Sequence, residues 1–438
     1  MNFRNIKLYI FCIILGALVS PIIICFRWLL NEIQIYRTAI LQSNQSIYIH
    51  ISLVVIMWII AMIIYRFSKK FPLTSGSGIP ETTEIATKHL RLLHPLINLI
   101  VKFIGGIVSI GMGFSLSRGG PAVEMGSFIG GLFRKSFNKS PLEQRRLEVV
   151  TGGAGLAAAF TTPLAATLFV IEGITHKISS KMTVSLLLAT GTAGWIALVT
   201  YPNNLYQSID VSSPAKMNMI EIAVSLFIFA IFVAVLGKIF NMLLLRSQST
   251  FNKIKLPLSI KILIAVLSIY FVGAWVPNLI ADGEPFLLSE RTTSISIMLI
   301  FLFIIIKILI TTISYAPGFP GGIFLPLLVI GGLTGEFYGM VMAHFGFCGQ
   351  SIHYGFFMIL GMAGFFAASV RTPVTAIIFT IEITRQFGAF FPSIIFVGMT
   401  YFISQLLSTK PIYTALYNQL IGDVQSSTPP HKSQRIDS

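Results

Sequence analysis

The stretch Ser117-Arg118-Gly119-Gly120-Pro121 interrupts an otherwise apolar chain, as do two similar stretches, Gly76-Ser77-Gly78-Ile79-Pro80 and Gly321-Gly322-Ile323-Phe324-Leu325-Pro326. Each places small residues and a proline where a membrane helix would continue or begin. Backbone N–H groups freed at such a break cannot face lipid, because they would stay unpaired there. Helix starts at these breaks would direct free N–H groups and positive dipole ends at one point. The three breaks therefore predict an anion site inside a membrane protein.

The composition is that of an integral membrane protein. Of the 438 residues, 54% are hydrophobic and 11% are charged, whereas soluble domains carry about 25% charged residues. The segment from Leu8 to Leu30 contains Arg27 and is followed by no small-residue cleavage site, so we expect a retained helix rather than a signal peptide. Further apolar segments, which lack the alternation of a barrel strand, cover residues 51–65, 93–116, 149–171, 184–199, 220–245, 260–276, 295–313, 323–343, 354–370, 374–383 and 391–407.

The formal net charge of +15 is explained by membrane topology rather than by nucleic acid. Basic residues gather in cytoplasmic loops by the positive-inside rule. The candidates for such loops are Arg66, Lys69, Lys70, Arg134, Lys135, Lys139, Arg145 and Arg146. A basic surface would also concentrate anions near a pore mouth, and the sequence leaves both explanations open. The cysteines Cys12, Cys25 and Cys348 have neither disulfide nor metal spacing, so we expect no metal and no cofactor.

The chain repeats itself once. The segment from Thr162 to Glu172 aligns without gaps on the segment from Thr372 to Glu382, with six identical positions that include the Thr-Pro start and the Ile-Glu end. In membrane transport proteins such halves often have inverted topology and meet at a site near the midplane. We therefore expect an all-α membrane fold of two inverted halves with many broken and re-entrant helices. The expected halves are residues 1–205 and 206–423, joined near 202–216, and a disordered polar tail covers residues 424–438.

At these breaks the chain resembles the CLC family of chloride channels and chloride/proton antiporters. The three stretches quoted above occur in the family's order, and Lys410-Pro411-Ile412-Tyr413 supplies a fourth signature. The resemblance covers about residues 5–422. It implies a homodimer with one pore in each subunit, embedded among lipids in the bacterial inner membrane. We expect the cytoplasmic nucleotide-binding domains that are common in eukaryotic members to be absent.

The resemblance implies a central chloride site made of four groups. These are the hydroxyls of Ser77 and Tyr413 and the backbone N–H groups of Ile323 and Phe324. Several modest donors suit chloride, because conduction needs binding that is weak enough for the ion to leave. In antiporters that the chain resembles, a proline at the position of Ser77 favours nitrate. The remaining pore-signature residues are Gly76, Gly78, Pro80, Arg118, Gly120, Pro121, Gly322 and Pro326.

The chain departs from the family at both proton-carrying positions. Antiporters that resemble it have a gating glutamate where this chain has Gly119, and an inner proton-transfer glutamate where it has Gly173. Glycine has no titratable group and no side chain that could close a pore. We therefore expect a channel-like or uncoupled chloride pathway, in a protein that catalyses no reaction.

Other charged residues leave alternatives open. Glu124 is either a structural partner of Arg118 or a substitute proton acceptor for chloride/proton antiport. Glu172 and Glu382 occupy equivalent positions in the repeat, which favours helix-end or packing roles. A secondary transporter of another, organic anion would use a guanidinium such as Arg118 or Arg371, although both are equally explained as structural anchors beside helix breaks. A membrane-embedded enzyme would need clustered His, Asp or Glu side chains, which the sequence does not show.

Overall fold

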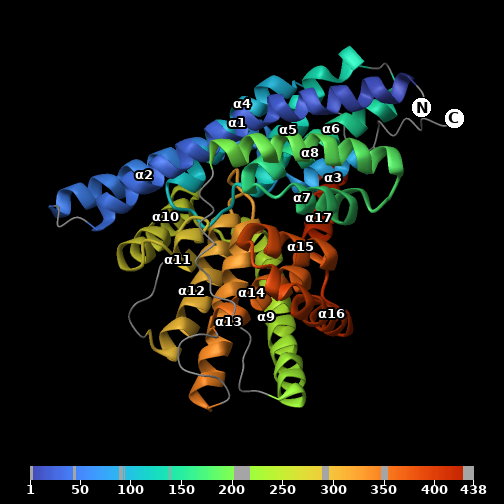
Figure 1. Cartoon of the computed structure of the whole chain (residues 1–438). Helices are drawn as coiled ribbons and strands as arrows, with labels where there is room; N and C mark the ends of the chain where they lie inside the picture. Colours follow the sequence, from blue (N-terminus) through green and yellow to red (C-terminus); the bar gives the residue numbers. More distant parts are fainter. Residues whose placement is uncertain are drawn as a thin grey trace.

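The computed structural model describes residues 3–42, 46–87, 92, 94–137, 140–201, 218–288, 295–346 and 354–427. Within these ranges the chain is almost entirely helical and forms no β-strand (Figure 1). The first group of helices is α1 (Phe3–Gln42), α2 (Ile47–Lys70), η1 (Pro72–Thr74), α3 (Ile79–Thr87), α4 (Pro95–Gly111), α5 (Gly119–Phe137), α6 (Pro141–Phe160), α7 (Pro163–Phe169), η2 (Val170–Thr175) and α8 (Ser180–Thr200). The second group is α9 (Met219–Lys253), α10 (Leu258–Trp275), α11 (Glu284–Leu288), α12 (Ile297–Tyr315), α13 (Phe324–His344), α14 (Tyr354–Val370), α15 (Pro373–Thr384), η4 (Phe387–Ala389), α16 (Phe390–Leu406) and α17 (Ile412–Ser427).

The helices differ widely in length, as expected for broken and re-entrant segments. Eight helices in the described part of the chain are long and apolar enough to cross a membrane. Others are too short for this, among them α4, α14 and α15. The prediction of an all-α integral membrane protein is confirmed.

The two groups of helices form two halves that lie side by side (Figure 1). Between them, Ser117 and Gly322 form an antiparallel bridge. The Ser117 N–H donates to the Gly322 carbonyl at 2.6 Å, and the Gly322 N–H donates back at 2.8 Å. The bridge joins the second and third signatures directly, so the halves meet at the predicted site.

Buried lysines repeat the same arrangement in each half. In the first half, Lys102 Nζ donates to the carbonyls of Thr74 and Gly76, at 3.2 and 2.9 Å. In the second half, Lys307 Nζ donates to the carbonyls of Leu279 and Ala281, at 2.8 and 2.9 Å. The two lysines and their two pairs of carbonyl acceptors are each separated by 205 residues in the sequence (102 and 307, 74 and 279, 76 and 281). Ser117 and Gly322, which form the bridge, are separated by the same number. A residue that bridges antiparallel to its own equivalent requires a two-fold relation between the halves, which confirms the predicted inverted repeat.

The terminal glutamates of the repeat hold the two halves together. The Glu172 carboxylate accepts from the N–H groups of Val374 and Thr375 at the start of α15, at 3.3 and 2.8 Å. The Glu382 carboxylate accepts from the N–H groups of Leu164 and Ala165 at the start of α7, at 3.1 and 2.7 Å. Each glutamate therefore caps a helix of the opposite half, where the positive dipole end favours a negative charge. The predicted helix-end role of both residues is confirmed.

One expected apolar segment, 149–171, is divided in two. Helix α6 ends at Phe160, Thr161 has a φ of +58°, and α7 begins at Pro163. The break follows from Pro163, which removes a backbone donor and keeps Thr162 out of the helical region. The break leaves the ring of Phe160, the last residue of α6, beside Gly119 and Phe324.

The expected boundaries of the halves and the tail stay predictions. The join near 202–216 lies outside them. Helix α17 continues to Ser427, so the first residues of the expected tail are helical, and residues 428–438 lie outside the described part.

Candidate anion site

The first and third signatures meet through backbone hydrogen bonds. The Gly76 N–H donates to the Gly318 carbonyl at 3.2 Å, and the Gly321 N–H donates to the Gly76 carbonyl at 3.0 Å. The second signature closes on the first, because a Cβ at Gly120 would lie 2.1 Å from the Ser77 carbonyl oxygen. Only glycine permits so close an approach of two backbones. The structure therefore brings all three predicted breaks to one point.

Two glycines shape the first signature. Gly76 and Gly78 have φ angles of +63° and +86°, in the left-handed region that side chains avoid. They turn the chain sharply on both sides of Ser77, just before α3 begins. This conformation leaves the Ser77 side chain 1% exposed, inside the protein.

The predicted donors include two buried hydroxyls. Among the described residues, neither Ser77 Oγ nor the Tyr413 hydroxyl makes a hydrogen bond of standard geometry, although the two side chains lie near enough to interact, and both residues are buried. An unpaired buried hydroxyl is unfavourable by roughly 1–3 kcal/mol unless a ligand satisfies it. Ile323 and Phe324 are fully buried at the start of α13, where the first N–H groups have no acceptor earlier in the helix. These groups have the chemistry of a site for a small anion.

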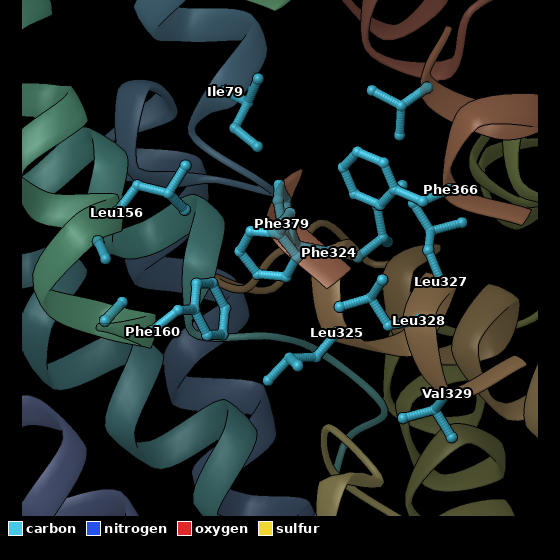
Figure 2. Packing of buried hydrophobic residues seen from close by; sticks show 14 of the residues in the cluster. Ile79, Leu156, Phe160, Phe324, Leu325, Leu327, Leu328, Val329, Phe366 and Phe379 are labelled. Carbon is cyan, nitrogen blue, oxygen red and sulfur yellow. The ribbon is translucent and has the colours of Figure 1, made fainter. Parts of the chain in front are cut away.

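An aromatic cluster, which was not predicted from the sequence, surrounds Phe324 (Figure 2). The ring of Phe324 lies 4.7 Å from those of Phe366 and Phe379, 5.4 Å from Phe169 and 5.6 Å from Phe160, between ring centroids. Phe169 also lies 6.1 Å from the Tyr413 ring, which ties the fourth signature to the cluster. A signal was present, because Phe169 and Phe379 are among the identical positions of the repeat.

Phe160 occupies the space beside Gly119. A Cβ built on Gly119 would lie 2.7 Å from a ring carbon of Phe160 and 3.3 Å from Cβ of Phe324. A side chain at position 119 would therefore have to displace the Phe160 ring. The ring belongs to the last residue of α6, just before the break. Gly119, the predicted gate position, therefore faces an aromatic side chain from the same half.

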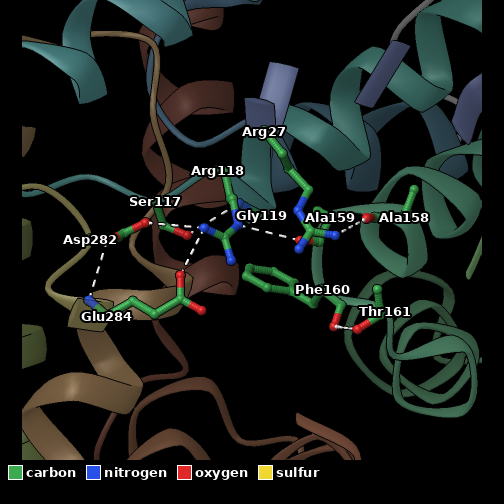
Figure 3. Close-up of polar contacts among 10 residues, drawn as sticks. All are labelled: Arg27, Ser117, Arg118, Gly119, Ala158, Ala159, Phe160, Thr161, Asp282 and Glu284. Atoms are coloured by element: carbon green, nitrogen blue, oxygen red, sulfur yellow. Dashed lines mark hydrogen bonds and ion pairs between the residues drawn. The ribbon is translucent and has the colours of Figure 1, made fainter. Parts of the chain in front are cut away.

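Arg118 joins the two halves next to Gly119 (Figure 3). Its guanidinium pairs with Glu284 at 2.8 Å and with Asp282 at 3.5 Å, and it lies over the Phe160 ring at 5.2 Å. Arg27 approaches from α1 and donates to the Ala158 carbonyl at 3.0 Å. The acidic partners lie far from Arg118 in sequence and were not predicted. The partners of Arg118 fit the structural reading of this guanidinium.

Glu124 does not pair with Arg118, which corrects one of the two predicted roles. Its carboxylate lies 2.6 Å from Lys102 Nζ, with both side chains fully buried. A Cβ at Gly78 would lie 2.6 Å from a Glu124 oxygen, so the carboxylate packs directly behind the first signature. Glu81, also buried, lies close enough to repel Glu124 electrostatically. A buried acid thus lies beside the site, already paired with a cation.

Two further candidates from the sequence are Gly173 and Arg371. Gly173 is in η2, where an added Cβ would lie 3.1 Å from Phe169 and 3.3 Å from Thr372. Arg371 donates to the carbonyls of Ser404 and Thr409, which fits the structural-anchor reading. Within the described ranges, no group of three or more His, Cys, Asp or Glu side chains could hold a metal ion.

Comparisons with known proteins agree on one family. The family model described as "Voltage gated chloride channel" matches residues 56–405. A similar protein, the H(+)/Cl(-) exchange transporter ClcA of Yersinia pestis bv. Antiqua (strain Angola), is 33% identical over 367 residues, covering 82% of this chain and 76% of the relative. The transporter of the same name from Klebsiella pneumoniae (strain 342) is 30% identical over 421 residues, covering 93% of this chain and 88% of the relative.

A solved structure extends the comparison to the fold. The structure described as that of a slow cyanobacterial Cl-/H+ antiporter matches with a TM-score of 0.83 and 26% identity, covering 97% of this chain and 100% of that chain. The chain therefore belongs to the voltage gated chloride channel family, the CLC family.

Proposed function

From this membership, we propose that the protein moves chloride across the bacterial inner membrane without obligatory proton coupling. The chloride ion binds where the Ser77 and Tyr413 hydroxyls meet the first N–H groups of α13, at Ile323 and Phe324. The observation that carries this proposal is the pair of buried hydroxyls that make no hydrogen bond of standard geometry among the described residues. Each would donate to the ion, and neither brings a charge that would slow its release. The protein acts as a transporter or channel, not as an enzyme.

The absence of coupling rests on Gly119 and Gly173. Neither position can carry a proton, and the Phe160 ring lies where a side chain at Gly119 would begin. Family membership further supports a homodimer with a pore in each subunit. Chloride and membrane lipid are then the partners, and nucleic acid is not among them.

The Tyr413 hydroxyl gives a direct test of the chloride site. Tyr413→Phe removes one donor and keeps the ring against Phe169. One hydrogen bond contributes about 1–1.5 kcal/mol, so chloride binding should weaken roughly five- to tenfold. The measurement is chloride flux from liposomes as a function of chloride concentration. Tyr417→Phe on the same helix, whose hydroxyl contacts Thr87 at 3.1 Å, is the control and should leave the flux unchanged. Equal effects of both variants would place the site elsewhere.

A second candidate function is chloride/proton antiport through Glu124. It is supported by the relatives, whose names describe exchangers, and by the burial of Glu124 behind Gly78. If Glu124 carries the proton, Glu124→Gln should abolish uphill proton movement and preserve chloride flux. We favour the uncoupled mechanism because both positions that carry protons in the antiporters are glycines here, Gly119 and Gly173.

A further inference from the structure

A cavity of about 410 Å³ lies away from the signatures, between the end of α9, the start of α10 and the last turn of α12. Most of its lining is apolar, including Phe251, Ile264 and Ile313, while Arg246 and Lys261 supply two positive charges. The volume is that of a pocket that buries much of a small amphiphile.

The two cations lack acidic partners. Among the residues that the structure describes, no ion pair joins Arg246 or Lys261 to a carboxylate. Lys261 Nζ donates to the Phe251 carbonyl at 2.7 Å and lies 5.1 Å from the centroid of that ring, which holds the ammonium at the cavity. The cavity therefore offers a fixed ammonium and an exposed guanidinium to an anionic group.

The surrounding sequence adds positive charge and no negative charge. Residues 33–80 and 222–281, which include α2, most of α9 and all of α10, contain no Asp or Glu. Helix α2 packs against this region, with the Tyr65 and Phe251 rings 6.3 Å apart, and it ends in Lys69 and Lys70. By the positive-inside rule this end faces the cytoplasm. This charge pattern is that expected near the headgroups of the inner leaflet.

We propose that this cavity binds an acidic phospholipid of the inner leaflet. Its phosphate lies between Arg246 and Lys261, and one acyl chain follows the apolar wall along Ile264 and Ile313. Basic pockets between membrane helices on the cytoplasmic side have the charge and depth for such headgroups.

The lipid would also touch a helix that supports the anion site. The cavity includes Ala316, two residues before Gly318. The Gly318 carbonyl accepts from the Gly76 N–H at 3.2 Å and from Ser75 Oγ at 2.8 Å. A bound lipid would therefore brace the turn on which the first signature rests.

The test compares lipids that share their acyl chains. The full chain in detergent is titrated with dioleoyl phosphatidylglycerol or dioleoyl phosphatidylcholine, and bound lipid is counted by native mass spectrometry. We expect retention of phosphatidylglycerol over phosphatidylcholine. Each basic residue near the headgroup strengthens lipid binding about fivefold. Lipid retention should therefore fall about fivefold in Arg246→Gln and about thirtyfold in Arg246→Gln with Lys261→Gln. Inorganic phosphate alone should not compete, because it lacks the acyl chain.

A charge-matched control separates a site from a diffuse attraction. Lys69→Gln with Lys70→Gln removes two charges from the same end of the protein without changing the cavity lining. This variant should keep its phosphatidylglycerol. The proposal is overturned if both double variants lose lipid equally, if phosphatidylcholine binds as well, or if neither variant changes retention. Arg246→Gln, at an exposed helix position, remains informative if Lys261→Gln does not fold.

Discussion

At the scale of single residues, Gly119 and Phe160 compete for one space. The sequence alone predicts that Gly119→Glu restores a gate, because a carboxylate there would meet free N–H groups at helix starts. The Phe160 ring, 2.7 Å from a Cβ at this position, modifies that expectation. The ring is packed between Phe324 and the Arg118 guanidinium, so moving it is unfavourable by about 1–3 kcal/mol.

The gate therefore needs two substitutions. In Gly119→Glu with Phe160→Ala, the ionised carboxylate should compete with chloride, and chloride flux should fall at neutral pH. Protonation removes the charge, so the flux should recover as the pH falls toward about 4–5. The measurement is chloride efflux from liposomes between pH 4 and 7.5, with Phe160→Ala alone as the control. Equal pH profiles of the two variants would show that position 119 does not face the pathway.

If Ser77 lines the proposed chloride site, replacing it should change the preference between chloride and nitrate. Ser77→Pro removes the hydroxyl donor from the turn between Gly76 and Gly78. Chloride then loses a directed hydrogen bond, and nitrate, which is larger and more weakly hydrated, loses less. We expect the ratio of nitrate to chloride permeability to rise, as measured by reversal potentials. Ser249→Ala, a surface serine on α9, is the control. An unchanged ratio would exclude Ser77 from the site.

At the scale of elements, the reciprocal glutamate caps couple the two halves. Glu382→Ala leaves the N–H groups of Leu164 and Ala165 without their acceptor, and Glu172→Ala does the same to α15. Each variant should lower the free energy of unfolding by about 1–2 kcal/mol, measured by chemical unfolding in detergent micelles. Glu143→Ala, which removes a peripheral ion pair with Lys181, should change it by less than about 1 kcal/mol. If all three variants unfold alike, the caps do not stabilise the contact between halves.

At the scale of the whole molecule, the sequence predicted those features of the fold that depend on short local motifs. The glycine breaks and the repeated Thr-Pro and Ile-Glu pattern predicted the inverted halves, because backbone geometry and capping act over short distances. The ion pairs of Arg118 with Glu284 and of Lys102 with Glu124 could not be predicted, since the fold alone brings these residues together. The position of Phe160 could not be predicted, because a single aromatic residue before a helix break has no distinctive sequence pattern.

The most direct test of the uncoupled mechanism is a recording of chloride flux and pH from the same liposomes. A chloride gradient is imposed across membranes containing the wild-type protein, and the external pH is followed while chloride moves. Because neither Gly119 nor Gly173 can hold a proton, we predict chloride flux without uphill proton movement. Reproducible uphill proton movement at a fixed chloride-to-proton ratio would contradict the account and would assign the coupling to Glu124.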